Sequence, residues 1–297
     1  MATLFIGMPV FGMDRFIEEA LDSLIGQDFE NWQLLIADNH SSDRTPEIGK
    51  RYEQIDSRIR FVRHDRNLGA PANFKYVLDA ADGDYFMWAA GDDVWAPGYI
   101  SFGIAALEAD DRVGLAFGNV VNTDTYGHII RTYPGFAAFS GPTQWRNILR
   151  YQLSPEIMGK ANLIYGVMPL DRARAAKLAS PLTDNWGSDM AFVLAVISRS
   201  RFAYIESMML EKRVVRDGDV RGKPRPIVIS RPKDHCFEIA VAPTYIAEAL
   251  GAVRGTPFLL LTVITMGWRL ISVCTRKFIA RAGHYLRLFL ARKSPRR

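Results

Sequence analysis

The chain has 297 residues, of which 48% are hydrophobic and 23% charged. This ordinary globular composition excludes intrinsic disorder and collagen-like or low-complexity architectures as the main state. Two cysteines, Cys236 and Cys274, are too few for a disulfide framework and favour a reducing compartment. The length suits one large α/β domain or two modest ones.

Charge is distributed unevenly along the chain. Residues 251–297 contain ten basic and no acidic residues, which leaves 27 basic and 32 acidic residues before them. A mildly acidic body is therefore followed by a strongly basic end, and this asymmetry indicates an anionic partner for that end. The apolar beginning lacks the basic residues of an export signal and contains Pro9, so it predicts a buried first strand.

The first 120 residues alternate short apolar runs with amphipathic stretches. The apolar runs predict four buried strands, which lie at 4–8, 34–37, 59–62 and 85–88. Apolar residues at helical spacing predict a helix after each strand, at 16–25, from 45 onward, at 71–81 and at 97–107. Strands separated by helices of this length predict an α/β fold with a mixed, mainly parallel sheet and helices on both faces.

The pattern changes after residue 113. Apolar stretches at 114–124 and 128–132 flank the turn Tyr126-Gly127 and predict a hairpin. The remaining predicted elements are a helix from 143, a strand near 163–168 and helices at 171–178 and 188–197. Several glycines, prolines and charges within 214–231 predict a mobile loop.

Two adjacent carboxylates, Asp92 and Asp93, follow closely on the strand at 85–88. Ligands bind beyond the carboxyl ends of the strands in such sheets, and Asp38 follows another of these strands. Like charges this close cost energy unless a cation or hydrogen-bond donors compensate, and Mg²⁺ or Mn²⁺ prefers one or two carboxylates plus substrate phosphates. The alternative is structural, with Asp93 capping the helix that follows and Asp92 in a turn. The strand–loop context favours the metal.

Several short motifs occur in a specific order in the first 95 residues. They are Met8-Pro9-Val10-Phe11, Ala20–Gln27, Ile36–Thr45, Asn67–Asn73, and Gly83-Asp84-Tyr85 followed by Gly91-Asp92-Asp93. Together they resemble the motifs of family 2 glycosyltransferases, and the resemblance extends over about residues 3–215. It implies a GT-A-type fold with a Rossmann-like nucleotide-binding half.

The resemblance also implies a nucleotide-diphospho-sugar donor, with a UDP-sugar favoured. Its binding residues would be Pro9, Val10, Phe11, Asp38, Asn39, Arg66, Asn73, Gly91, Asp92 and Asp93. Asp38 would accept hydrogen bonds from the base or ribose. Asp92 would bind a Mn²⁺ or Mg²⁺ ion that bridges the two phosphates, supported by Asp93. For Arg66, a solvated surface arginine is an equally good interpretation. The sequence departs from the family at Ala90 and Asn39, where the family has aspartates.

The second half supplies the candidate base. Asp184-Asn185-Trp186-Gly187-Ser188-Asp189 precedes a predicted helix and resembles the acidic segment of the family, with Ser188 replacing a glutamate. Asp189 is our candidate general base for an inverting transfer, and Asp184 is the reserve. The alternative for Asp189 is a helix N-terminal carboxylate stabilised by the helix dipole. Trp186 would stack on an acceptor sugar.

A later segment resembles the loop that closes over the diphosphate in this family. Arg213 or Arg216 would supply a cation there, although solvated loop arginines are an equally good interpretation.

The end of the chain has the pattern of a basic amphipathic helix. A helical projection of 268–291 puts Ile271, Phe278, Ala282, Tyr285, Leu286 and Phe289 on one face and Arg269, Arg276, Lys277, Arg281 and Arg287 on the other. This pattern is typical of a segment in a membrane interface, and the apolar run 257–267 would reach deeper. The alternative is a helix packed on the protein's own core. Nucleic acid is not expected as a partner, because nothing upstream offers a basic groove or a base-stacking platform.

We therefore expect a glycosyltransferase domain at 1–235, with a nucleotide-sugar-binding half at 1–118 and an acceptor half at 119–235, and then a helical, basic segment at 236–297. The expected enzyme works peripherally on the cytoplasmic face of a membrane and glycosylates a polyprenyl-linked or cell-envelope glycan. A catalytically silent nucleotide-sugar-binding subunit is the main alternative, favoured by Ala90, Asn39 and Ser188. A nucleotidyltransferase would need a Gly-rich basic loop after the first strand, which the sequence lacks.

Overall fold

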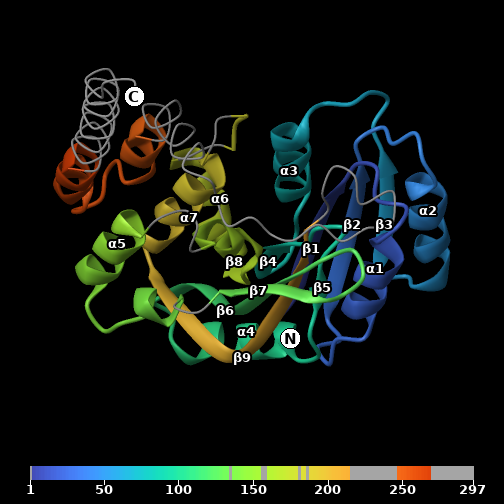
Figure 1. Ribbon diagram of the computed structural model, residues 1–297, viewed down its shortest axis with the longest axis horizontal. Coiled ribbons are helices and arrows are strands. Elements are labelled where there is room, and N and C mark those ends of the chain that lie inside the picture. The colour runs from blue at the N-terminus through green and yellow to red at the C-terminus, as the bar shows by residue number, and fades with distance from the viewer. Residues whose placement is uncertain are drawn as a thin grey trace, which may run out of the picture.

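The computed structural model describes residues 2–133, 136–154, 159–179, 182–184, 187–214 and 246–268. Trp186, Arg216, the predicted loop from 215 onward and the predicted basic helix from 269 onward lie outside these residues. The described chain contains two β-sheets and the helices that pack on them (Figure 1).

The first sheet contains the strands predicted in the N-terminal part of the chain. Its strands are β1 (Leu4–Val10), β2 (Trp32–Asp38), β3 (Ile59–Arg63), β4 (Tyr85–Trp88) and β8 (Met168–Pro169), in the order β3-β2-β1-β4-β8. The first four are parallel, and β8 pairs antiparallel with β4. Every residue of β1 except Pro9 is buried, as expected for a central parallel strand covered on both faces. This confirms the predicted mainly parallel sheet.

A helix follows each of the four parallel strands along the chain, as predicted. They are α1 (Ile17–Ile25), α2 (Thr45–Ile55), α3 (Ala70–Asp79) and α4 (Tyr99–Ala109). Because crossovers are right-handed, α1 and α2 lie on one side of the sheet, and α3, where the strand order reverses, lies on the other (Figure 1). A Cβ at Gly7 of β1 would lie 2.6 Å from the Val77 side chain, so this glycine permits the close packing of α3.

The second sheet includes a strand that the sequence did not predict. Its strands are β5 (Val94–Trp95), β6 (Val113–Thr123), β7 (Ile129–Tyr133) and β9 (Arg201–Arg213), in the order β5-β9-β6-β7. The β6–β7 pair confirms the predicted hairpin. β9 runs parallel to β6 and antiparallel to β5, and it was missed in the sequence. A bridge between Ala116 and Val167 joins the two sheets.

The remaining helices pack against the two sheets and against one another. They are η1 (Phe136–Phe139), α5 (Gln144–Leu153), η3 (Lys160–Tyr165), α6 (Leu170–Ala179) and α7 (Ser188–Ile197). The strand predicted near 163–168 was largely wrong, because Gly159 in the left-handed region starts a 3₁₀ helix there and the extended backbone begins only at Gly166. Residues 246–252 and 259–268 are also helical. Within the described residues, no helix combines the length and the apolar character needed to cross a bilayer.

Candidate active site

The predicted donor-binding residues gather beyond the carboxyl ends of β1, β2, β3 and β4. Asn39, buried after β2, donates from its backbone to the Val10 carbonyl oxygen over 2.9 Å. Its side-chain amide donates to the Asn67 side chain over 2.9 Å and accepts from the Leu68 backbone over 2.8 Å. Asn39 therefore ties together the loops that follow three neighbouring strands.

Asn73, at the start of α3, anchors the same edge from the other side. It is buried, and its amide nitrogen donates to the Ala37 carbonyl oxygen over 2.8 Å. Its amide oxygen lies 2.9 Å from Nε2 of His64. These contacts hold the end of β2 in place. Arg66 lies on the loop between β3 and α3, and its side chain is exposed.

Asp38 is fully buried at the end of β2. Its carboxylate accepts from the Ser41 backbone over 3.2 Å and from the Ser41 hydroxyl, and its Oδ2 lies 3.2 Å from Nε of Arg63. Because Asp38 is fully buried, a contact with a nucleotide base or ribose would require neighbouring atoms to move aside. The predicted role of Asp38 stays a prediction.

The loop after β1 is held by hydroxyl groups from the loop after β2 and from the start of α2. The Gly12 and Met13 backbone groups donate to the Ser41 and Thr45 hydroxyls over 2.9 and 2.8 Å. Phe11 is half exposed at the rim of this edge. A Cβ at Gly91 would lie 2.9 Å from the Val10 side chain, so glycine allows the loop carrying the acidic pair to approach β1.

The two carboxylates after β4 have different surroundings. Asp93 is fully buried, and it accepts from the Arg213 backbone over 3.1 Å and from the Lys212 ammonium group over 3.5 Å. The register of β5 on β9, in which Val94 pairs with Glu211, places these donors opposite it. Asp92 is only partly buried. Asp93 thus faces the protein, while Asp92 retains access to solvent.

Burial and charge set the ionisation of this cluster. Burial raises the pKa of Asp93 to about 6; Lys212 acts against this shift and the Asp92 charge adds to it. Burial also raises the pKa of Asp92, which Lys212 and Arg213 oppose. Burial disfavours the charge of Lys212, but Tyr165 and the two carboxylates together raise its pKa. Lys212 is therefore a permanent cation beside the acidic pair.

Arg213 points elsewhere. Its guanidinium donates to Glu19 over 2.6 Å and lies 4.7 Å from the centre of the Phe16 ring, beside α1. The structure brings the Lys212 ammonium group, rather than the Arg213 guanidinium, to the acidic pair. Sequence reasoning missed Lys212 because it treated this segment as a loop. The apolar and aromatic residues of 202–210 were the signal that could have revealed the strand.

Asp189 lies in the first turn of α7, as predicted. Its carboxylate accepts from the Met190 backbone over 2.7 Å. Burial raises the pKa of Asp189, while this hydrogen bond and the Lys212 charge act in the opposite direction. The Lys212 charge thus counteracts the burial that raises the pKa of Asp92, Asp93 and Asp189, and its ammonium group contacts Asp93. The reserve candidate Asp184 is exposed.

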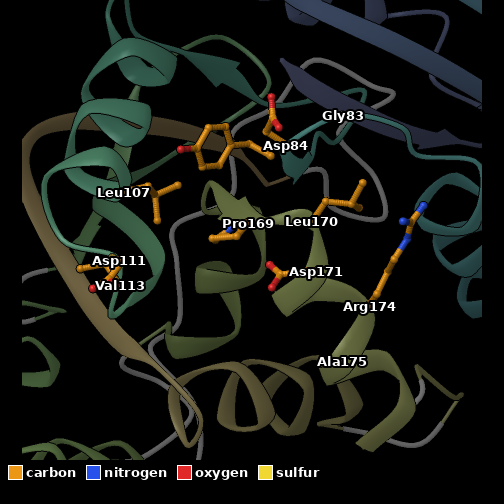
Figure 2. A pocket seen from close by; sticks show the side chains of 11 residues that line it. Gly83, Asp84, Leu107, Asp111, Val113, Pro169, Leu170, Asp171, Arg174 and Ala175 are labelled. Atoms are coloured by element: carbon orange, nitrogen blue, oxygen red, sulfur yellow. The ribbon is translucent and has the colours of Figure 1, made fainter. Parts of the chain in front are cut away.

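A broad, open cavity lies elsewhere on the protein. It has a volume of about 780 Å³ and is located at the beginning of β4, beside the start of α6 (Figure 2). Asp84, Asp171 and Arg174 are among the residues that line it, and none of the predicted site residues does. Since ligands of parallel sheets bind at the carboxyl ends of the strands, we place the candidate site at Asp92 and not in this cavity.

The acidic edge, formed by Asp92 and Asp93 after β4, fits one particular kind of metal site. Within the described residues, no three His, Cys, Asp or Glu side chains converge as a ready-made metal cage. Asp93 is already engaged by Lys212 and Arg213, which leaves Asp92 as the accessible carboxylate. Mg²⁺ and Mn²⁺ are commonly held by one or two carboxylates, with water and substrate phosphates as the other ligands. The residues present fit such a site, in which substrate phosphates and water complete the coordination of the ion.

The chain is thus an α/β protein with an acidic pair after the fourth strand of its mainly parallel sheet. The family described as Glycosyl transferase family 2 matches residues 5–168, which is more than half of the chain. The chain belongs to this family. The match confirms the resemblance seen in the sequence and the predicted enzyme class, a glycosyltransferase.

Curated relatives match the chain over shorter stretches. A putative teichuronic acid biosynthesis glycosyltransferase, TuaG of Bacillus subtilis (strain 168), is 33% identical over 87 residues, which are 29% of this chain and 34% of that protein. A GalNAc(5)-diNAcBac-PP-undecaprenol beta-1,3-glucosyltransferase of Campylobacter jejuni is 26% identical over 136 residues, 46% of this chain and 43% of that protein. The matches thus span less than half of each of these relatives.

Solved structures share the fold over most of the chain. S. aureus TarS 1–349 in complex with UDP-GlcNAc has a TM-score of 0.62 at 13% identity, covering 91% of this chain and 72% of that one. The mannosyltransferase PcManGT from Pyrobaculum calidifontis, solved with GDP-Man and Mn²⁺, has a TM-score of 0.59 at 15% identity, covering 98% and 80%. These similarities confirm the predicted GT-A fold.

Proposed function

We propose that the protein transfers a sugar from a nucleotide-diphospho-sugar to a hydroxyl group of a cell-envelope glycan. The observation that carries this proposal is the acidic pair Asp92 and Asp93 after β4: the Lys212 ammonium group contacts Asp93, and its charge also counteracts the burial that raises the pKa of Asp189. Family membership supports it, and the UDP-GlcNAc and GDP-Man complexes of the fold neighbours support a nucleotide-sugar donor. Among such donors we propose a UDP-sugar.

The leaving nucleoside diphosphate gains negative charge as the sugar departs. A Mn²⁺ or Mg²⁺ ion held by Asp92, with Asp93 behind it, would neutralise part of that charge. Lys212 is the second source of positive charge at this place, and its contact with Asp93 keeps it there. The Mn²⁺ in the PcManGT structure supports the choice of cation.

Asp189 is the proposed general base. It takes the proton of the acceptor hydroxyl while the new bond to the sugar carbon forms and the bond to the phosphate oxygen breaks, which inverts that carbon. The raised pKa of Asp189 suits this role, because a base is most effective when its pKa approaches the working pH. Trp186 is proposed to stack on the acceptor sugar.

The acceptor is proposed to be lipid-linked. The Campylobacter relative is named for an undecaprenol diphosphate glycan, and the Bacillus relative for teichuronic acid biosynthesis. The low cysteine content favours a reducing compartment. We therefore propose that the enzyme works at the cytoplasmic face of the membrane.

A silent nucleotide-sugar-binding subunit is the second candidate, because Ala90 replaces one of the family aspartates. The nucleotidyltransferase alternative does not agree with the family membership.

The test measures nucleoside diphosphate release and glycolipid formation. Purified protein is incubated with Mn²⁺, UDP- and GDP-sugars, and short polyprenyl-diphosphate glycans. We expect one donor to be consumed only when an acceptor is present. Asp189→Asn should lower kcat by about 10²–10⁴ while donor binding is retained. Asp171→Asn, which also changes an acidic residue in the first turn of a helix, is the matched control. Donor binding without turnover on any acceptor would support the silent subunit.

A further inference from the structure

The helix at 259–268 has two faces of opposite character. One face is buried, with Thr262 fully buried and Thr265 and Met266 nearly so. The other face exposes large apolar side chains, with exposed fractions of 41% for Leu259, 69% for Leu260, 49% for Val263, 59% for Ile264 and 60% for Trp268. On a helical projection these five side chains fall on one side, which we call the apolar face.

The buried side of this helix is fixed to the glycosyltransferase domain by polar contacts. Gln152 of α5 is fully buried and donates to the Thr262 hydroxyl over 2.6 Å, and its amide oxygen accepts from Thr265. Buried hydrogen bonds of this kind are directional and set the rotation of the helix. The apolar face is therefore turned outward by the packing of the domain.

The preceding helix, at 246–252, is fixed to the same region. Arg199, just after α7, donates to the carbonyl oxygens of Ala252 and Arg254, the latter over 2.9 Å. Thr183 donates to Glu248 over 2.6 Å. Both helices lie beside α5 and α7, at the end of the long axis opposite α2 (Figure 1).

An apolar surface of this kind normally marks an interaction site. Residues 259–268 include no charged side chain, and the 29 residues that follow them contain nine basic and no acidic side chains. A tryptophan at the edge of an apolar surface, followed by many basic residues, suits a lipid bilayer with anionic headgroups. A protein partner would have to present acidic and apolar groups in a fixed pattern that matches this surface. An anionic bilayer supplies apolar acyl chains and acidic headgroups everywhere along its surface.

We infer that the apolar face, formed by Leu259, Leu260, Val263, Ile264 and Trp268, inserts into the surface of an anionic lipid bilayer. Because α5 and α7 hold this helix, insertion would anchor the glycosyltransferase domain in a defined orientation, and not merely on a tether. The inference deepens the proposed function, since it would bring the site to a lipid-linked acceptor. The binding itself requires neither donor nor transfer.

The experiment uses the full chain and vesicles without donor or acceptor. Vesicles contain phosphatidylcholine with about one third phosphatidylglycerol, and a second set carries brominated acyl chains. We expect co-sedimentation with anionic vesicles and quenching of tryptophan fluorescence by the brominated lipid. Trp268→Phe should remove most of that quenching, because Trp268 is the tryptophan on the apolar face.

The deciding variant is Leu260→Gln/Ile264→Gln, which changes the most exposed aliphatic residues of the apolar face, one helical turn apart. Glutamine preserves helix propensity. The loss of two apolar side chains that would be buried in the bilayer should weaken vesicle binding at least about tenfold. The Tm should not change, because both side chains are exposed. Ile55→Gln, at a 64% exposed position at the end of α2, is the matched control and should bind as wild type.

Three results would overturn the inference. The first is equal vesicle binding by wild type and the double variant. The second is a clear drop in the Tm of the double variant with no vesicle binding by wild type, which would mean that another part of the chain covers the face. The third is a lipid-free dimer that the double variant dissolves, which would make a second copy the partner. None of these results depends on sugar transfer, so the proposed function would be judged separately.

Discussion

The Lys212 ammonium group lies 3.5 Å from the Asp93 carboxylate and 4.6 Å from the centre of the Tyr165 ring. A lysine in such a position neutralises a carboxylate that burial would otherwise protonate. Asp93 in turn gives Lys212 a fixed location beside the more accessible Asp92. Lys212 and Asp93 thus form one electrostatic pair. Lys212 keeps Asp93 ionised, and Asp93 holds the Lys212 ammonium group in place.

A double-mutant cycle tests this pair. Lys212→Met should lower the free energy of unfolding by about 2 kcal/mol, less than the ~3–5 kcal/mol of a fully buried broken pair, because 27% of the Lys212 side chain is exposed. Asp93→Asn should also destabilise, since it leaves Lys212 without that carboxylate. Urea unfolding of the double variant should show a smaller loss than the two single losses added together. If the loss in the double variant equals the sum of the two single losses, Lys212 and Asp93 do not stabilise each other.

Asn39 shows how a departure from the family motif is accommodated at the level of one loop. Its amide nitrogen donates to the Asn67 side-chain oxygen, which also accepts from the Gly69 backbone over 2.8 Å. An aspartate at this position would face an oxygen that is already an acceptor. The asparagine is therefore the residue that this loop conformation requires.

The loop that follows β3 should respond to Asn39→Asp. The substitution removes one partly buried hydrogen bond and sets two acceptors against each other, at a cost of about 1 kcal/mol. We expect lower stability in urea and weaker binding of UDP by calorimetry. Asp65→Asn changes an exposed residue of the same loop and should leave both quantities near the wild-type values. Similar behaviour of the two variants would show that Asn39 does not organise the loop.

At the element scale, the parallel strands could be predicted because each is a short apolar run bounded by polar residues. The prediction of β4 matched the structure at both ends, since Asp84 and Gly91 bracket a fully apolar segment. β9 could not be predicted as readily, because Glu206, Glu211 and Lys212 interrupt its apolar residues. The same strand carries the missed site residue. Its pairing with β5 joins Lys212 to a carboxylate 119 residues earlier, and no local pattern contains that information.

At the scale of the whole molecule, the charge of one lysine, Lys212, acts on carboxylates from both halves of the chain. Asp92 and Asp93 follow a strand of the first sheet, and Asp189 begins a helix beside the second. Burial raises the pKa of all three. The resemblance located these acids, but their burial and the nearby charge of Lys212 arise only when the two sheets pack together.

These pKa shifts give activity and stability opposite pH dependences. The base must be ionised, so kcat should fall as the pH drops through the raised pKa of Asp189, above the ordinary aspartate value of about 3.9. A carboxylate whose folded-state pKa is raised adds stability below its unfolded pKa and loses that contribution as the pH rises through the folded value. Acidification from neutral pH should therefore reduce kcat before it reduces the Tm. A loss of activity that follows the Tm would contradict this account.

Calorimetric titration of UDP into the wild-type protein and into Asp92→Asn, each with and without Mn²⁺, tests most directly whether the acidic edge holds a cation that binds the diphosphate. We predict that Mn²⁺ tightens UDP binding by wild type at least about tenfold, or about 1.4 kcal/mol. In Asp92→Asn the Mn²⁺ effect should disappear, while the weaker metal-free binding, supported by Lys212, should persist. UDP affinities that are equal with and without Mn²⁺ in both proteins would contradict the account.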